Sequence, residues 1–160
     1  MDKQLIVTQI IQELEAVRLV AVNAVIQASE TATHEENVAE NQYDTLGLEA
    51  AYLAHGQAQR VAECDADLVA FKVLSLPETS EDMAVALGTL VVIGDEMDSE
   101  QCLFIGPAAG GLKIEHHDHS ITVITPSSPL GKALMGSRLD DEVELCIGDS
   151  KHTYDVISVL

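Results

Sequence analysis

The sequence is poor in aromatic residues and has no long apolar run. Its 160 residues include no tryptophan, two phenylalanines and three tyrosines. No stretch of about 18 consecutive apolar residues occurs, so no segment qualifies as a transmembrane helix. The first residues lack the basic start and the cleavage site of a signal peptide. With 47% hydrophobic residues the chain can still bury a modest core, and we expect a globular protein of the cytoplasm.

Basic residues are also scarce. Eight Lys and Arg stand against 27 Asp and Glu, which gives a net charge of −19. Residues 1–75 carry 4 basic and 12 acidic side chains (−8), and residues 76–160 carry 4 and 15 (−11). Nucleic-acid-binding proteins neutralise phosphates with Lys and Arg, so neither half is suited to bind DNA or RNA independently. A protein with a basic surface, or a metal ion, is a better match, although acidity also serves solubility alone.

Cysteines are few and widely spaced. Cys64, Cys102 and Cys146 form no CxxC motif, and their number is odd. A disulfide framework and a zinc ribbon are therefore not indicated, and we expect buried, reduced thiols.

The first half of the chain has the pattern of two long helices. Apolar residues recur every three to five positions from Leu5 to about Ala28 and again from Leu46 to about Leu74. The polar, acidic segment between them is too short for another element. Residues 1–75 therefore predict an antiparallel coiled-coil hairpin whose acidic tip spans about residues 32–45.

The second half alternates apolar and polar residues. Residues 76–86 break the helical period and are predicted as a linker, and residues 87–160 are predicted as a small β-rich domain. A proline at 129 and a glycine at 136 frame one short helix between the strands. The fold class is thus α+β: a helical hairpin followed by an antiparallel sheet with one short helix.

Two segments resemble the GreA/GreB transcription elongation factors. ITPSSPLGKALMGSRLDDEVEL, residues 124–145, resembles the family's C-terminal domain, in which a Ser-Pro pair opens a short helix. EENVAENQYDTLGLEAAYLA, residues 35–54, resembles the acidic tip of the family's coiled coil. The resemblance covers nearly the whole chain and implies a C-terminal domain like that of the FK506-binding proteins.

The resemblance also implies an activity. Family members insert the hairpin into the secondary channel of bacterial RNA polymerase, where tip carboxylates help to hold a magnesium ion and a water so that backtracked RNA is cut. Such a factor is not an enzyme and has no cofactor of its own, since the magnesium belongs to the polymerase. Its partner is RNA polymerase, it meets DNA and RNA only through that partner, it has no membrane role, and we expect a monomer when it is free.

Individual tip residues follow the resemblance only in part. Glu40 and Asn41 match the family's Glu-Asn pair, and Tyr43 matches its aromatic residue. The family places an aspartate three residues before the glutamate, where this chain has Asn37. The nearest carboxylate is Glu36, four residues before Glu40, and this departure bears on RNA cleavage rather than on polymerase binding.

The chemistry of the tip can be stated from the residue types. Magnesium prefers oxygen ligands, and one or two carboxylates can complete a site whose other ligands lie elsewhere. Glu36 and Glu40, one helical turn apart, are the candidate catalytic and metal-binding pair, with Glu35 and Asp44 as substitutes. The alternative is that the acids solvate the hairpin end, with Asn41 as the cap of the second helix.

A second candidate polymerase contact lies in the C-terminal half. Ser127, Ser128 and Pro129 precede the short helix and are predicted to cap it. The resemblance implies that this loop also faces the polymerase, together with Asn41 and Tyr43 at the tip.

The run HHDH places three histidines close together. On one strand His117 and His119 would share a face that could bind zinc, but further ligands are missing nearby. A solvated strand end is the preferred interpretation.

The sequence is compatible with more than one function. The chain is a factor that stimulates cleavage or a channel-binding regulator without cleavage activity. A peptidyl-prolyl isomerase is suggested by fold analogy alone, and residues 87–160 hold only Phe104 and Tyr154 for an aromatic pocket. A coiled-coil adaptor would leave the acidic tip without a role.

Overall fold

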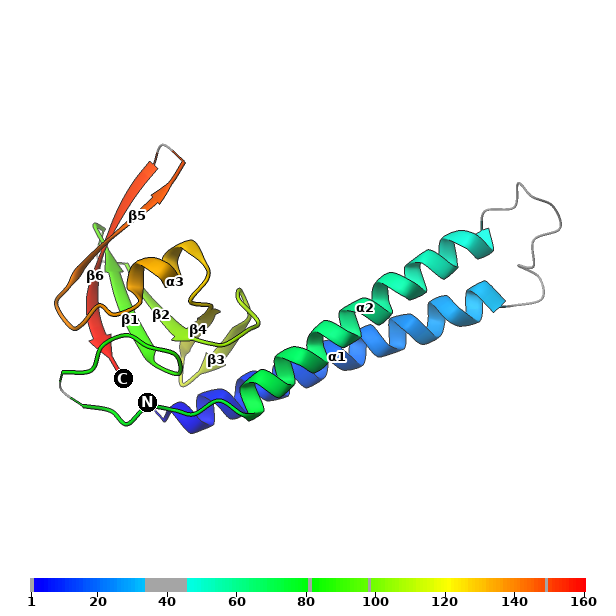
Figure 1. The fold of residues 1–160 in the computed structure, drawn as a ribbon, viewed down its shortest axis with the longest axis horizontal. Helices are drawn as coiled ribbons and strands as arrows, with labels where there is room; N and C mark the ends of the chain where they lie inside the picture. Colours follow the sequence, from blue (N-terminus) through cyan, green and yellow to red (C-terminus); the bar gives the residue numbers. More distant parts are fainter. Residues whose placement is uncertain (1, 34–45, 81, 98, 149) are drawn as a thin grey trace. The chain divides into compact units, whose positions relative to one another are not determined.

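The computed structural model describes residues 2–33, 46–80, 82–97, 99–148 and 150–160 (Figure 1). Two helices come first, followed by six strands with a third helix before the fifth strand. The chain forms two compact units. One consists of Gln12–Val69, and the other combines Met1–Ile11 with Ala70–Leu160. No helix within the described ranges is long and apolar enough to cross a membrane.

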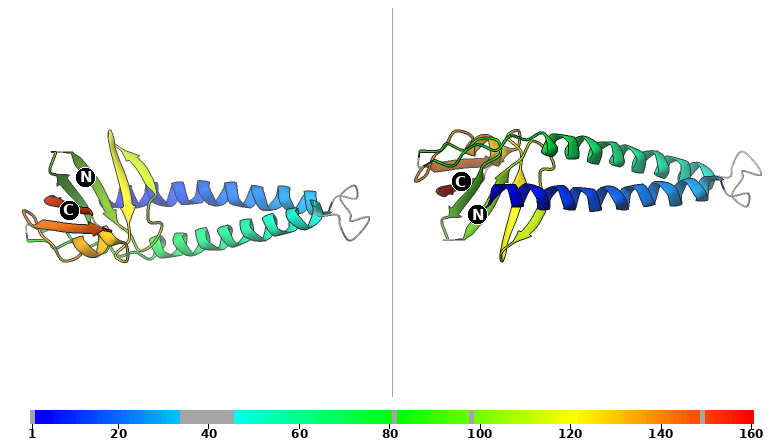
Figure 2. Two further views of the ribbon diagram at one scale, coloured as in Figure 1. Left: turned by 90° about the horizontal axis from the view of Figure 1, so that it is seen from above. Right: turned by 90° about the horizontal axis from the view of Figure 1, so that it is seen from below.

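The first unit is a helical hairpin, as the sequence predicts. Helix α1 spans Lys3–Thr33 and α2 spans Leu46–Lys72, and the two run antiparallel side by side (Figure 2). Asp2 caps α1, because its side chain accepts a hydrogen bond of 2.9 Å from the backbone N–H of Gln4. Buried residues at helical spacing form the seam: Leu14, Ala21, Ala28, Ala50, Cys64 and Leu68.

A six-stranded sheet dominates the second unit. Its strands are β1 (Leu90–Asp95), β2 (Glu100–Ile105), β3 (Lys113–His116), β4 (His119–Ile124), β5 (Glu142–Ile147) and β6 (Ser150–Val159). Their order in the sheet is β3-β4-β2-β1-β6-β5. The alternating pattern of the second half therefore corresponds to strands, as predicted. The α+β class is therefore confirmed.

One strand pair differs from the antiparallel sheet that we expected. Strands β2 and β4 run parallel, with Cys102 opposite Ile121 and Ile105 opposite Ile124. The cause is the hairpin of β3 and β4: β3 lies at the sheet edge, and β4 returns between β3 and β2. The sheet is therefore mixed, with the remaining pairs antiparallel.

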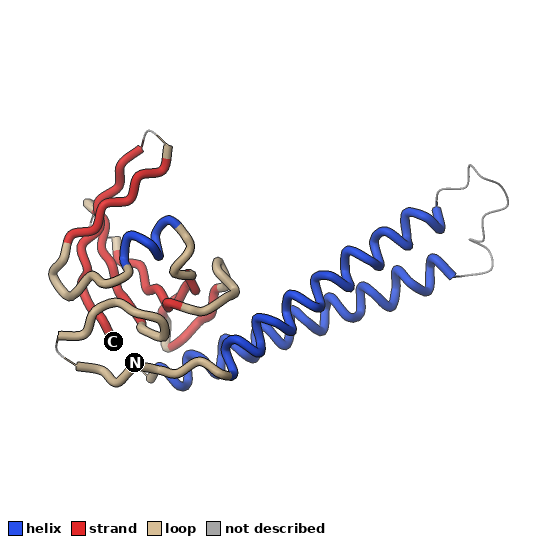
Figure 3. Tube along the Cα trace, in the orientation of Figure 1, coloured by secondary structure: helices blue, strands red, loops and turns tan. Residues whose placement is uncertain are grey.

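Helix α3, Pro129–Leu134, packs against this sheet and is the one short helix among the strands in Figure 3. Leu134 is fully buried, and Leu130 and Ala133 are packed against the core, which is the apolar side predicted for this helix. The buried core residues are Val85, Val91, Ile93, Leu103, Ile105, Ile124, Leu134, Val143 and Val156.

The ends of the long helices belong to the same unit as the sheet. Ile6 and Ile10 of α1 and Phe71 of α2 are buried. The ring of Phe71 lies 6.4 Å from that of Phe104 on β2, measured between centroids. These aromatic and aliphatic contacts hold both helix ends within the sheet unit.

The three cysteines are free. Cys64 is buried in the hairpin, Cys102 is half-buried in β2, and Cys146 is exposed on β5. Burial raises the pKa of the Cys102 thiol. The expectation of buried thiols therefore holds fully for Cys64 alone.

Candidate functional site

The loop before α3 is built as a tight cap. Ser128 has an extended backbone, with φ −66° and ψ 156°, and its Oγ accepts a 3.0 Å hydrogen bond from the N–H of Gly131. The same hydroxyl donates to the carbonyl oxygen of Thr125 at 2.8 Å. Pro129 occupies the first helical position, where a missing N–H costs nothing. The predicted capping role of this segment is confirmed.

Gly131 allows the loop to approach the helix closely. A Cβ atom at this position would lie 2.0 Å from the carbonyl oxygen of Thr125 and 2.8 Å from Ser128 Oγ. Only glycine fits without moving the backbone of Thr125. The loop is therefore fixed at both ends, by its own hydrogen bonds and by this close contact.

The fixed loop presents two of its three candidate residues to solvent. Ser127 and Pro129 are exposed, and Ser127 Oγ lies 3.0 Å from Thr125 Oγ1. Ser128 is half-buried and its hydroxyl is used by the cap. Ser127 and Pro129 can thus contact a partner directly, whereas Ser128 positions them.

A neighbouring loop, residues 106–112, lies beside this one. Its backbone is tied to β4 by 2.8 Å hydrogen bonds from Gly106 N–H to Ile124 O and from Gly111 N–H to Val123 O. Gly110 faces Thr125, whose Cγ2 atom lies 3.4 Å from the position of an added Cβ. We call residues 106–112 and 125–129 the neutral loop surface, because they contain no Asp, Glu, Lys or Arg.

The neutral loop surface is unusual in a chain with a net charge of −19. Sequence reasoning singled out residues 127–129 but missed the Gly-rich loop at 106–112. The available signal was the lack of charge from Gln101 to Leu112 and from Ser120 to Gly131. Such a surface suits a partner region that is itself weakly charged, because no carboxylate there must lose its hydration.

The end of α2 packs against one loop of this surface. A Cβ on Gly106 would lie 2.9 Å from Cζ of Phe71 and 2.7 Å from Cγ1 of Val123. The Phe71 ring therefore packs directly on the first residue of the 106–112 loop. The position of the loop depends on the last turn of α2.

The tip residues lie outside the described part of the chain. The described helices end at Thr33 and resume at Leu46. The candidate residues Glu35, Glu36, Glu40, Asn41, Tyr43 and Asp44 fall between these positions. Their roles at the metal and at the polymerase stay predictions.

The histidine run forms a turn rather than a strand face. His117 and Asp118 have φ values of 46° and 64°, which is the two-residue turn that joins β3 to β4. His117 and His119 therefore do not share the strand face that a zinc site would need, and both side chains are exposed, in line with the preferred interpretation of a solvated strand end. Within the described ranges, no three His, Cys, Asp or Glu side chains are arranged to hold a metal ion.

His116 has a role that the sequence did not suggest. Only 4% of its surface is exposed, and its Nδ1 lies 2.7 Å from Oε1 of Gln9 on α1. The Gln9 amide nitrogen also donates to the carbonyl oxygen of Glu115, at 3.4 Å. One glutamine thus ties the start of α1 to the β3–β4 hairpin.

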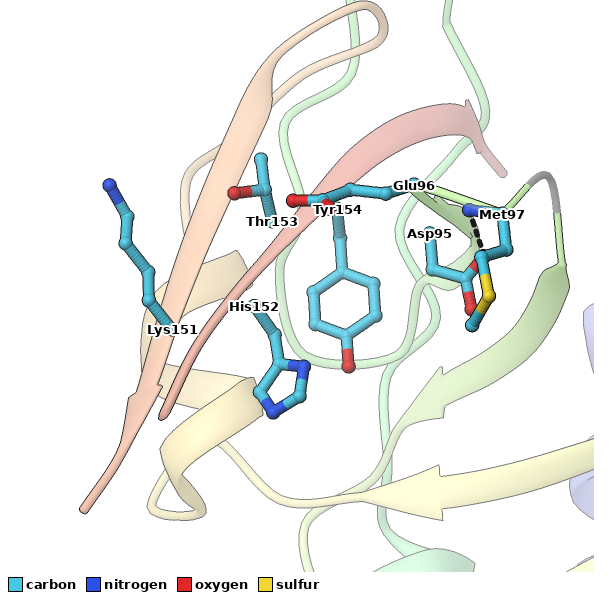
Figure 4. A pocket seen from close by; sticks show the side chains of 7 residues that line it. All are labelled: Asp95, Glu96, Met97, Lys151, His152, Thr153 and Tyr154. Atoms are coloured by element: carbon cyan, nitrogen blue, oxygen red, sulfur yellow. Dashed lines mark hydrogen bonds between the residues drawn. The ribbon is translucent and has the colours of Figure 1, made fainter. Parts of the chain in front are cut away.

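A hollow of about 220 Å³ lies between the end of β1 and β6 (Figure 4). Its polar groups are already engaged: the Asp95 carboxylate accepts from the N–H groups of Met97 and Ser99 at 2.9 Å, and Lys151 pairs with Glu144. Lys151 extends away from the ring of Tyr154, and Tyr154 and His152 are the two ring side chains in the lining. This hollow is not the apolar, aromatic-lined pocket that a peptidyl-prolyl isomerase requires.

Comparison with known proteins matches residues 80–160 to the family model described as transcription elongation factor, GreA/GreB, C-term. This range contains the whole sheet, α3 and the neutral loop surface. The chain belongs to the GreA/GreB family.

Curated relatives agree along most of the chain. Transcription elongation factor GreA of Syntrophus aciditrophicus (strain SB) is 27% identical over 150 residues, covering 92% of this chain and 86% of that protein. Its counterpart in Nitratidesulfovibrio vulgaris (strain DSM 19637 / Miyazaki F) is 27% identical over 139 residues, covering 85% and 79%. Alignments of this length extend beyond residues 80–160 into the first half of this chain.

Solved structures of the family are also similar. The crystal structure of GreA factor homolog 1 (Gfh1) of Thermus thermophilus matches with 19% identity and a TM-score of 0.39, covering 94% of each chain. A GreA/GreB elongation factor from Nitrosomonas europaea matches with 20% identity and a TM-score of 0.38, covering 65% of this chain and 78% of that one.

Proposed function

We propose that this GreA/GreB-family protein binds bacterial RNA polymerase, docks through the neutral loop surface and inserts its hairpin tip into the secondary channel. The observation that carries the proposal is the family match over residues 80–160, which contains the capped loop with exposed Ser127 and Pro129. A rigid loop loses little conformational entropy on binding, so its contacts translate efficiently into affinity. We also propose that the protein acts in the cytoplasm and meets DNA and RNA only through the polymerase.

We propose that the polymerase and this chain each supply part of the site that cuts the RNA. The polymerase supplies the magnesium that activates water and stabilises the leaving oxygen of the RNA. On this chain Glu40 is the principal carboxylate and Glu36 its displaced partner, with Glu35 and Asp44 as substitutes. The factor performs no reaction by itself, because its carboxylates complete a site that the polymerase provides.

The departure at Asn37 defines two versions of this function. In one, Glu36 replaces the missing aspartate and the factor stimulates cleavage of backtracked RNA. In the other, the changed spacing removes that activity, and the protein is a channel-binding regulator of initiation or elongation. Both versions use the same docking surface and differ only in the geometry of the tip carboxylates.

Docking is tested with Ser127→Asp combined with Pro129→Ala. A carboxylate inside an uncharged contact loses hydration without gaining a partner, so the affinity for core RNA polymerase should fall about tenfold or more. The cap residue Ser128 is left in place, and the matched control is Ser120→Asp at the exposed start of β4. Binding is measured with labelled protein, and equal affinity of the double variant and its parent would overturn the docking assignment.

Tip chemistry is tested on a stalled, backtracked elongation complex with end-labelled RNA. If the factor stimulates cleavage, Glu40→Gln should abolish it and Glu36→Gln should reduce it, while binding survives because neither residue belongs to the docking surface. Cleavage unaffected by both substitutions would shift the assignment to Glu35 and Asp44. A parent that binds but gives no cleavage at any magnesium concentration identifies the regulator.

A further inference from the structure

Part of the helical hairpin carries no charged side chain on either helix. Residues 19–29 of α1 and residues 50–59 of α2 contain no Asp, Glu, Lys or Arg. Ala24 of the first segment and Leu53 of the second line the same hollow, so the two segments lie at one level of the hairpin. We call these two segments the neutral band.

Large apolar side chains of the neutral band point into solvent. Val20 is 69% exposed and Leu53 is 57% exposed. Leu19, Ile26 and Tyr52 are exposed as well, so apolar groups project from several sides of the hairpin. Helices that are apolar on more than one side are normally covered by a further element, and contiguous exposed apolar surface marks an interaction site.

The neutral band also contains a hollow that can receive an apolar side chain from the band of a second copy. A hollow of about 220 Å³ opens between the helices, where Ala24, Ala28 and Ala50 leave room and Leu53 stands at the margin. Val20 lies one helical turn before Ala24 on the same side of α1. In a two-fold arrangement, Leu53 of each copy enters the hollow of the other, as a knob enters a hole in a coiled coil.

We propose that the free protein self-associates by packing the neutral band of one copy against that of a second copy. Two chains with a net charge of −19 repel each other wherever acidic surfaces meet. Within the described residues of the unit Gln12–Val69, the band holds the longest stretch without charge on each helix, whereas Asp65 and Asp67 lie beyond it on α2. A basic protein or a nucleic acid finds no complementary charge here, so another copy is the occupant that the chemistry favours.

The size of the band sets the strength of the association. Eleven helical residues span about 16 Å, and two helices side by side are about 20 Å wide. The face of the band that these two dimensions enclose is smaller than the roughly 800 Å² that each partner buries in a stable specific interface. The dimer is therefore weak and concentration-dependent, and the monomer that we expected from the sequence stays the prediction for dilute protein. The inference concerns the free protein and does not rest on the proposed function.

Sedimentation equilibrium of the full chain tests this inference. Between about 10 μM and about 1 mM, the mean mass should rise from the monomer value towards twice that value, because weak interfaces dissociate in this range. The monomer mass is 17.1 kDa. Added salt should strengthen the association by screening the repulsion between the two acidic chains, whereas a dimer held by ion pairs would weaken.

Variants locate the interface. Leu53→Glu and Val20→Glu should each weaken association at least tenfold, because two-fold symmetry brings every added carboxylate into the interface twice. Val69→Glu is the matched control, since Val69 is 61% exposed on α2 but lies outside the band, and it should dimerise like the parent. Leu53→Ser provides an uncharged second variant, and helical circular dichroism verifies that each hairpin is intact. A parent that stays at 17.1 kDa throughout, or equal effects of Leu53→Glu and Val69→Glu, would overturn the inference.

Discussion

Gly131 decides the geometry of the loop that precedes α3. The Ser-Pro sequence was enough to predict the cap, because Ser at an N-cap and Pro at the first helical position act through local geometry. The role of Gly131 was not predictable, since it depends on how closely the Thr125 carbonyl approaches it in space. The tip carboxylates could be named only through the family resemblance, and their arrangement stays a prediction.

A substitution at this glycine should therefore be costly. Gly131→Ala places a methyl group 2.0 Å from the Thr125 oxygen, so either the loop or the helix must move. We expect the free energy of unfolding to fall by about 3 kcal/mol, the upper range for overpacking. Gly110→Ala is the control, because its Cβ meets Thr125 at an ordinary 3.4 Å. Urea denaturation of both variants measures the effect, and equal stability would contradict the role assigned to Gly131.

At the scale of elements, the alternating pattern identified each strand but not the complete pairing. Alternation reports which residues face the core, and it says nothing about which strand lies next in the sheet. The parallel pair of β2 and β4 arises because β3 takes the edge position, a choice made by tertiary packing. Helix α1 likewise continues to Thr33, beyond the last clearly apolar position of its pattern.

The contact between α1 and the β3–β4 hairpin gives a second stability prediction. Gln9→Ala leaves the buried His116 Nδ1 without its 2.7 Å partner, which should cost about 1–3 kcal/mol. A double-mutant cycle with His116→Ala should show a coupling free energy of about 1 kcal/mol, because the two side chains interact directly. Gln12→Ala, at an exposed position one turn along, is the control. Strict additivity of Gln9→Ala and His116→Ala would show that the contact contributes nothing.

At the scale of the whole molecule, charge distribution distinguishes the surfaces. The net charge of −19 argues against independent nucleic-acid binding from composition alone. Locating the uncharged surfaces required the structure, because residues 106–112 and 125–129 are brought together only when β4 pairs with β2. The acidic tip lies in the first half of the chain and the proposed docking surface in the second half, which suits a factor that binds with one part and acts with another.

We propose that the tip of the hairpin reaches the active centre of RNA polymerase. The most direct measurement replaces the polymerase magnesium by iron(II), generates hydroxyl radicals there and maps the cuts in end-labelled protein. We expect cuts within residues 34–45 that require core polymerase and disappear when excess magnesium displaces the iron. No cuts, or cuts confined to residues 106–129, would contradict it.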